Sequence, residues 1–196
     1  KRLEAIVKER TAEIAEQNEI LAEQKDEIEL KNQDILDSIK YAKRIQDSIL
    51  PPNERMAKMF TDYFVLFKPK DIVSGDFYWA EKIEGKSLFA AVDCTGHGVP
   101  GAMVSVVGNN GLNRSVKEFN LRKPGAILDQ LREIVIEAFN AQNNMDVKDG
   151  MDIALCSIDY ENLKLEFSGA NNPCIIIRDG EILETKADKQ PIGQFI

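Results

Sequence analysis

The chain has 196 residues, 43% of them hydrophobic and 30% charged, a balance that predicts a soluble globular protein rather than a disordered or membrane-embedded one. Its formal net charge of −8 repels nucleic acid, so we expect no nucleic-acid partner. No apolar run approaches the ~20 residues that a membrane-spanning helix needs. An odd, sparse set of cysteines (Cys94, Cys156 and Cys174) indicates a reducing compartment, so we expect a cytoplasmic protein, with a membrane anchor upstream of Lys1 still compatible.

Residues 1–50 predict one long helix, because they contain no Gly or Pro and are rich in good helix formers. Apolar residues recur at every seventh position: Val7, Ile14, Leu21, Ile28 and Ile35. With these at position d of a heptad, the a positions are mostly polar, which lowers stability but favours two parallel strands: Glu4, Thr11, Asn18, Lys25, Asn32 and Ile39. We therefore expect a parallel homodimeric coiled coil; a single solvated helix with a weak apolar stripe is the alternative.

The pair Pro51-Pro52 ends the helix, and residues 51–62 are expected to form a linker. From Tyr63 onward the apolar pattern changes to short runs separated by turn residues, with two helical stretches between them. This order predicts an α+β fold with antiparallel hairpins rather than a doubly wound parallel sheet. The expected strands are 63–67, 76–80, 87–92, 151–158, 163–167, 174–177 and one near 182–183; the expected helices are 99–119 and 124–139.

Two carboxylates stand at strand ends, where a rigid element would hold them: Asp76 in SGDFYW and Asp93 in AAVDCTGHG. Neighbouring strands of a hairpin lie about 4.8 Å apart, so the two side chains could share one site. Carboxylates with backbone carbonyls suit hard cations such as Mg²⁺ or Mn²⁺. An Asp beside Gly at a strand end is also a common turn residue, so the pair alone leaves both interpretations open.

Several motifs occur in one order at compact spacing: KPKDIVSGDFYW, VDCTGHGVPGAMVS, DGMDIALCSID, SGANNP and DKQPIG. Together they resemble the SpoIIE/RsbU-type branch of the PPM metal-dependent serine/threonine protein phosphatases. The preceding YAKRIQDSILPP is similar to the helix before the phosphatase domain in that branch, so the resemblance covers roughly residues 38–196. It divides the chain into a coiled-coil signalling helix (1–50), a linker (51–62) and a partial phosphatase domain (63–196).

The resemblance implies an αββα sandwich that holds two Mn²⁺ or Mg²⁺ ions, which activate a water for attack on phosphoserine or phosphothreonine. Asp76 matches the first metal-ligand aspartate, Asp93 the aspartate that bridges both metals, and the backbone carbonyl of Cys94 a further ligand. Asp152, in the GMD motif, is not counted among these ligands. His97 has two open roles: to protonate the leaving serine oxygen, or to satisfy a backbone group in its Gly-His-Gly turn.

The family pattern continues with further aspartate motifs beyond the PIG sequence that precedes Ile196. On the resemblance, the chain is therefore C-terminally truncated, its sandwich is incomplete, and it is expected to be weakly active or inactive while the parent protein is an active phosphatase. A cysteine nucleophile at Cys94 is disfavoured, because no basic loop follows it to hold a phosphate.

The function that these observations predict is dephosphorylation of a regulatory phosphoprotein, of which an anti-sigma-factor antagonist is the usual kind in this branch. An upstream sensor domain would control the reaction through the dimeric coiled coil. The alternative is a non-catalytic dimeric scaffold or signal-relay module that carries a phosphatase-like domain.

Overall fold

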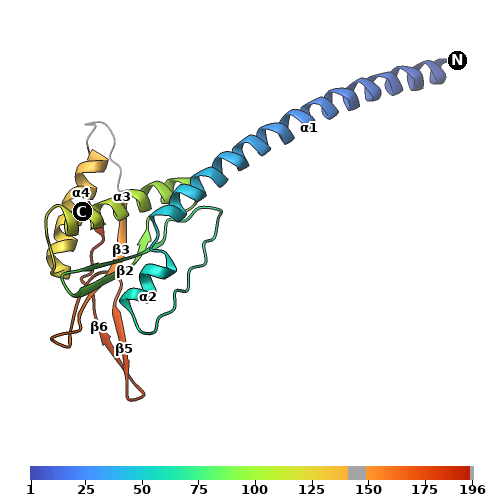
Figure 1. The fold of residues 1–196 in the computed structure, drawn as a ribbon. Helices are drawn as coiled ribbons and strands as arrows, with labels where there is room; N and C mark the ends of the chain where they lie inside the picture. Colours follow the sequence, from blue (N-terminus) through green and yellow to red (C-terminus); the bar gives the residue numbers. More distant parts are fainter. Residues whose placement is uncertain (141–148, 195–196) are drawn as a thin grey trace. The chain divides into compact units, whose positions relative to one another are not determined.

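The computed structural model describes residues 1–140 and 149–194, which form two compact units, Lys1–Tyr41 and Ala42–Ile196 (Figure 1). Residues 141–148 and 195–196, which the predicted domain 63–196 includes, lie outside the described residues. The division into residues 1–50, 51–62 and 63–196 stays a prediction. Within the described part of the chain, no helix is both long and apolar enough to cross a membrane.

The predicted N-terminal helix is present as α1, Arg2–Ile49, and it ends just before Pro51-Pro52. The d-position side chains of its heptads are all exposed in this single chain, by 56–60%: Val7, Ile14, Leu21, Ile28 and Ile35. Only Gln46, near the C-terminal end of α1, is buried. The part of α1 in the first unit is therefore largely exposed, whereas its C-terminal end, from Ala42, belongs to the second unit, where Gln46 is buried.

The segment expected as a linker contains a short helix, α2, Asn53–Met59. Met56 and Met59 are buried and pack with Ala80, which belongs to the first strand of the sheet. The sequence signal for a linker was the Pro51-Pro52 pair, but two methionines three residues apart give one turn of helix an apolar face to bury.

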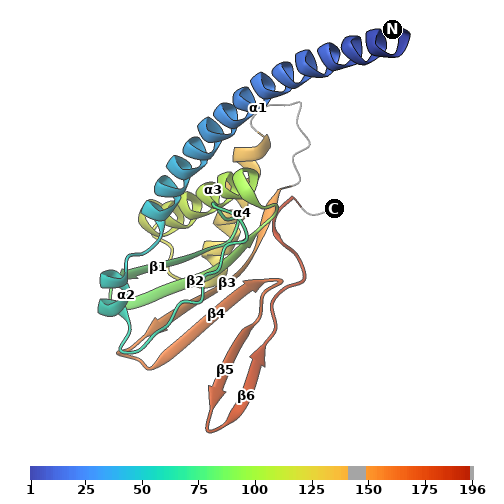
Figure 2. The ribbon, with the colours of Figure 1, turned by 90° about the vertical axis from the view of Figure 1, so that its right-hand side faces the viewer.

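The main sheet has the strand order β1-β2-β3-β4, all antiparallel, and β7 pairs with β3 (Figure 2). Its strands are β1 Phe77–Ile83, β2 Lys86–Cys94, β3 Gly150–Asp159, β4 Lys164–Ala170 and β7 Ile192–Gly193. A two-residue turn joins β1 to β2, and both of its residues have positive φ, 48° at Glu84 and 78° at Gly85. Such a turn matches the twist of the strands and fixes their register. The antiparallel hairpins expected from the sequence are confirmed.

Two helices, α3 Gly98–Lys117 and α4 Pro124–Asn140, cover one face of this sheet and enclose the core (Figure 2). Several large side chains in this layer are completely buried, each stabilising the fold by roughly 1.5–3 kcal/mol: Leu88, Leu112, Ile127, Leu131, Ile153 and Leu155. The glycines of α3 permit close packing, since a Cβ at Gly108 would lie 2.8 Å from Met151 of β3.

A second, two-stranded sheet consists of β5 Cys174–Arg178 and β6 Glu181–Thr185. The described residues thus contain one helical layer, a five-stranded sheet and this separate hairpin (Figure 2), which is the α+β class expected for part of an αββα sandwich. The outward side chains of the hairpin are largely in solvent; Ile177 and Ile182 are 72% and 71% exposed.

The strand predicted at residues 63–67 is wrong. This segment has no regular secondary structure, and two of its apolar side chains, Phe64 and Leu66, are 89% and 75% exposed. A run of β-prone residues becomes a strand only when a neighbour completes its hydrogen bonds. Among the described residues, no strand pairs with it.

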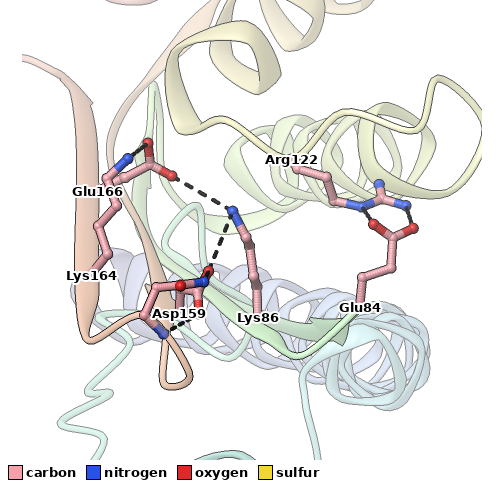
Figure 3. A network of polar contacts seen from close by, with 7 residues as sticks. Glu84, Lys86, Arg122, Asp159, Lys164 and Glu166 are labelled. Carbon is pink, nitrogen blue, oxygen red and sulfur yellow. Dashed lines mark hydrogen bonds and ion pairs between the residues drawn. The ribbon is translucent and has the colours of Figure 1, made fainter.

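At the β1–β2 turn, charged side chains link the sheet to the α3–α4 connection (Figure 3). Arg122 donates two hydrogen bonds to the Glu84 carboxylate, at 2.7 and 3.1 Å, and a third to the backbone carbonyl of Val116. Lys86 Nζ lies 3.9 Å from a carboxylate oxygen of Asp159 on the adjacent strand. This network holds the turn end of the strands, opposite the end where Asp76 and Asp93 stand.

Candidate functional site

Asp76 and Asp93 stand side by side at one end of the β1–β2 hairpin. Asp76 immediately precedes β1, and Asp93 is the next-to-last residue of β2. The register pairs Phe77 with Val92, so the next step outward places Asp76 across from Asp93. Phe77 and Val92 are buried against the helices, and side chains alternate along a strand, so the two carboxylates point to the opposite face of the sheet. The structure therefore brings together the two residues that the sequence singled out; their role as metal ligands stays a prediction.

The closeness of the two carboxylates has an electrostatic consequence. Partial withdrawal from water raises the pKa of the Asp76 carboxyl above its usual value, and a hydrogen bond with Asp93 and repulsion by its charge raise it further. Within the described residues, no basic side chain forms an ion pair with either group. Two adjacent carboxylates with no cationic partner are a donor set that a hard cation would stabilise.

The backbone carbonyl of Cys94 lies against the segment that carries Asp76. A Cβ built at Gly75 would be 3.2 Å from this carbonyl oxygen and only 2.7 Å from that of Gly96. The Cys94 thiol, in contrast, is in the core, where burial first, and then the charges of Asp76 and Asp93, raise its pKa. The buried sulfur is therefore poorly suited to act as a nucleophile, while the role of the Cys94 carbonyl oxygen as a metal ligand stays a prediction.

A tight turn of glycines gives the loop after Asp93 its shape. Gly96 and Gly98 adopt φ values of +83° and +62°, which side chains rarely tolerate. Gly101, in the first turn of α3, packs so closely that a Cβ there would lie 2.6 Å from the Gly96 carbonyl oxygen and 3.0 Å from the Gly75 Cα. Three backbone segments thus meet without intervening side chains beside Asp76.

His97 precedes α3 as its N-cap residue, and its side chain forms no capping hydrogen bond. Its Nδ1–H donates instead to Oδ2 of Asp71 at 2.8 Å, and both side chains are exposed. The histidine therefore bonds to a carboxylate rather than to the backbone group considered from the sequence. With Nδ1 bonded to Asp71, Nε2 is the ring nitrogen that remains for another hydrogen bond.

Four further residues, which the sequence did not assign to the site, lie near it. Asp152 of β3 is directly opposite Asp93 in the sheet register and accepts a hydrogen bond from Asn171 at 2.8 Å. Thr95 donates to Asp149 at 2.9 Å, which ties the loop after Asp93 to the start of β3. The GMD motif was the available signal for Asp152, but nothing in the sequence could place it opposite Asp93.

The end of α1 is attached to the same region by Gln46, which is only 3% exposed. Its amide nitrogen donates to the Ser74 carbonyl at 2.5 Å and to the Ser105 hydroxyl at 2.9 Å, and its amide oxygen accepts from the Ser74 N–H at 2.9 Å. Ser74 is two residues before Asp76, and Ser105 belongs to α3. One side chain of α1 therefore holds two of the segments that shape the site.

The carboxylate pair opens onto a pocket of about 520 Å³ on the face of the sheet away from the helices. Its walls come from β1, β2 and β3, the segment 64–68 and the start of β5. No group of three or more Asp, Glu, His or Cys side chains within residues 1–140 and 149–194 is arranged to hold a metal ion. Asp76, Asp93 and the Cys94 carbonyl thus fit a hard cation as a partial set of ligands.

The sequence model described as stage II sporulation protein E (SpoIIE) matches residues 83–195, more than half of the chain. Among solved structures, the SiaA-PP2C domain of Pseudomonas aeruginosa is similar at 31% sequence identity with a TM-score of 0.74. That match covers 83% of this chain and 64% of the SiaA domain chain, so the chain spans less than two thirds of this relative's length.

A more distant similarity is to the PP2C phosphatase domain and regulatory fragment of SpoIIE from Bacillus subtilis, at 20% identity and a TM-score of 0.49. It covers 62% of this chain and 34% of that one. A comparison with curated proteins gave no significant match.

The close approach of Gly101 to Gly96 predicts that Gly101→Ala destabilises the protein. Alanine would add about 1 kcal/mol of helix propensity, but the clash with fixed backbone atoms costs about 1–3 kcal/mol and also displaces the loop beside Asp76. We expect a lower Tm in thermal denaturation. Gly125→Ala in α4 is the matched control, because its Cβ would meet no atom closer than 3.9 Å, and its Tm should equal or exceed that of the wild type. A Gly101→Ala protein as stable as the control would contradict the described packing.

Proposed function

Because the chain belongs to the SpoIIE family, we propose that it carries the catalytic aspartates of a metal-dependent phosphatase that acts on phosphoserine or phosphothreonine in a regulatory protein. An anti-sigma-factor antagonist is the proposed kind of substrate. The observation that carries the proposal is the position of Asp76 beside Asp93, with the Cys94 carbonyl next to them and no basic partner among the described residues.

In the proposed mechanism, Asp76, Asp93 and the Cys94 carbonyl would hold Mn²⁺ or Mg²⁺. Two such ions, when bound, supply an acidified water and neutralise charge on the attacking and leaving oxygens. The protein's net charge of −8 makes this neutralisation necessary, since a phosphate dianion would otherwise be repelled. The two carboxylates are fixed at the ends of paired strands, so their separation is set by the sheet rather than by a loop.

His97 is the proposed proton donor to the leaving serine or threonine oxygen. Asp71 accepts the hydrogen bond from Nδ1, which fixes the orientation of the ring. The Nε2–H could then donate to a substrate oxygen placed between the histidine and the carboxylate pair.

We also propose that α1 forms a parallel homodimeric coiled coil through which an upstream sensor acts on the site. The exposed apolar d positions of α1 support a second copy of the chain as their partner. The Gln46 contacts give a physical route for coupling, because a shift of the end of α1 would change the hydrogen bonds to Ser74 and Ser105. A cytoplasmic location is part of this proposal.

A non-catalytic scaffold is the second candidate function. It is favoured by one observation: within the described residues, the acidic side chains do not gather into a group of three or more around a metal position. In this case the domain would bind a partner without turning over phosphate, and its fold would serve the dimer rather than a reaction. Activity measurements separate the two.

The enzyme proposal predicts Mn²⁺-dependent release of phosphate from a phosphoserine protein by the full-length protein. Asp93→Asn should lower kcat/KM at least about a hundredfold, because it removes one charge from the proposed metal ligands. Asp129→Asn, the same change at an exposed position of α4, should leave the rate unchanged. If the Asp93→Asn protein were as active as the wild type, or if neither protein turned over substrate, the scaffold would be the better account.

The coupling proposal predicts that Gln46→Ala weakens both stability and the site. Loss of the amide leaves the buried Ser74 backbone groups without partners, which costs about 1–3 kcal/mol of the free energy of unfolding. Denaturant titration should show this loss, and Mn²⁺ should bind less tightly because the Asp76 segment is released. Gln33→Ala, at an exposed glutamine of the same helix, is the control and should have neither effect.

The dimer proposal predicts that Leu21→Glu shifts the chain from dimer to monomer in light scattering, because it places a charge in the apolar seam. Leu30→Glu is the matched control: Leu30 is 66% exposed but lies two residues beyond the d position of Ile28, outside the seam, and this variant should remain dimeric. A wild-type chain that stays monomeric at high concentration would rule out the coiled-coil dimer.

A further inference from the structure

Two of the three cysteines lie next to each other in the wall of the pocket and have no part in the proposed phosphatase reaction. The Sγ atoms of Cys156 and Cys174 are 3.9 Å apart, and both residues are free thiols. Cys156 is buried on β3, and Cys174 is the half-buried first residue of β5. Both line the pocket that Asp76 and Asp93 also line.

The thiol pair lies where the β5–β6 hairpin meets the main sheet. At its base, the hairpin is attached by backbone hydrogen bonds from Asn171 to Asp188 (2.8 Å) and from Asp188 to Gly169 (3.1 Å). Beyond that point, β5 and β6 bond only to each other within the described residues. A covalent link at Cys174 would therefore add a second attachment, on the side of the hairpin that faces the pocket.

We propose that Cys156 and Cys174 are a redox-modification site, at which a hydroperoxide converts the two thiols into a disulfide that fastens the β5–β6 hairpin to β3. The sulfur atoms are 3.9 Å apart with no other group between them, and they have to approach to the ~2.05 Å length of a disulfide for the bond to form. The inference goes beyond the proposed phosphatase function and does not depend on metal binding or on catalysis.

The oxidation proceeds in two balanced steps. The Cys174 thiolate attacks one oxygen of hydrogen peroxide and becomes a sulfenic acid, while the O–O bond breaks and the other oxygen leaves as hydroxide, which takes up the thiol proton to give water. Cys156 Sγ then attacks Cys174 Sγ, the S–O bond breaks, and the hydroxide leaves with the Cys156 proton as a second water. The two sulfurs lose two electrons in total, and one peroxide is reduced to two waters.

The two cysteines differ in burial, and this difference assigns the order in which they react. Cys174 is half-buried and can meet a peroxide that enters the pocket. Burial, followed by the neighbouring Cys174, raises the pKa of Cys156 to about 12, so Cys156 is the less reactive thiol toward peroxide and reacts second, when the departing hydroxide takes its proton. Two thiols that acted only as small apolar groups would stay reduced in peroxide and remain open to alkylation.

The test treats the reduced chain with hydrogen peroxide, removes the oxidant, and then denatures and alkylates it before mass spectrometry. Before alkylation, the oxidised protein should be lighter than the reduced protein by two hydrogens. The reduced protein should then take up three alkyl groups, and the oxidised protein only one, on Cys94. Tryptic digestion should then give one cross-linked species that joins residues 149–164 to residues 165–178. Three alkylated thiols after oxidation, or a disulfide that includes Cys94 or joins two chains, would overturn the proposal.

A second measurement follows the hairpin itself. The disulfide joins residues 18 positions apart, so it restricts the unfolded chain, and the Tm of the oxidised protein should rise by several degrees. Cys174→Ser keeps a side chain of similar size and cannot form the link; peroxide should leave its Tm unchanged and its Cys156 alkylatable. An equal peroxide-induced rise in Tm in this variant would also refute the site.

Discussion

The antiparallel register between β1 and β2 is the constraint on which the rest of the site depends. Side chains alternate between the two faces of a strand, so Val92 packs in the core while Asp93 faces the pocket. A slip of β2 by one residue would turn Asp93 into the apolar core and Val92 out toward the pocket. The positive φ values of Glu84 and Gly85 hold the turn that sets this register, and the Arg122–Glu84 ion pair steadies the same turn from outside.

Close backbone packing fixes the loop after Asp93 against the ends of the strands. Gly75, Gly96 and Gly101 approach so closely that no side chain fits between them, which keeps the Cys94 carbonyl against the segment of Asp76. Gln46 joins this arrangement from α1, since its single amide bonds to the backbone before Asp76 and to α3. The helix end, the loop and the carboxylate pair are therefore joined by direct contacts, and the proposed coupling of α1 to the site depends on these contacts.

Much of this could be predicted from the sequence because the signals are local. Heptads and an absence of Gly and Pro identified α1, alternating apolar runs identified most strands, and strand-end positions identified Asp76 and Asp93. The segment 63–67 has the same local pattern as a strand but lacks a pairing partner, which is a property of the fold and not of five residues. Gln46, Asp71 and the Cys156–Cys174 contact join positions 18 to 59 residues apart, so no local pattern marks them.

Titration of the chain with Mn²⁺ in a calorimeter tests most directly whether Asp76 and Asp93 form one hard-cation site. Our account predicts a saturable binding heat for the wild type that disappears in Asp76→Asn, because one carboxylate and a carbonyl cannot replace the paired charge. Binding that is equally tight in the wild type and in this variant would contradict it, and would place any metal away from the end of the β1–β2 hairpin.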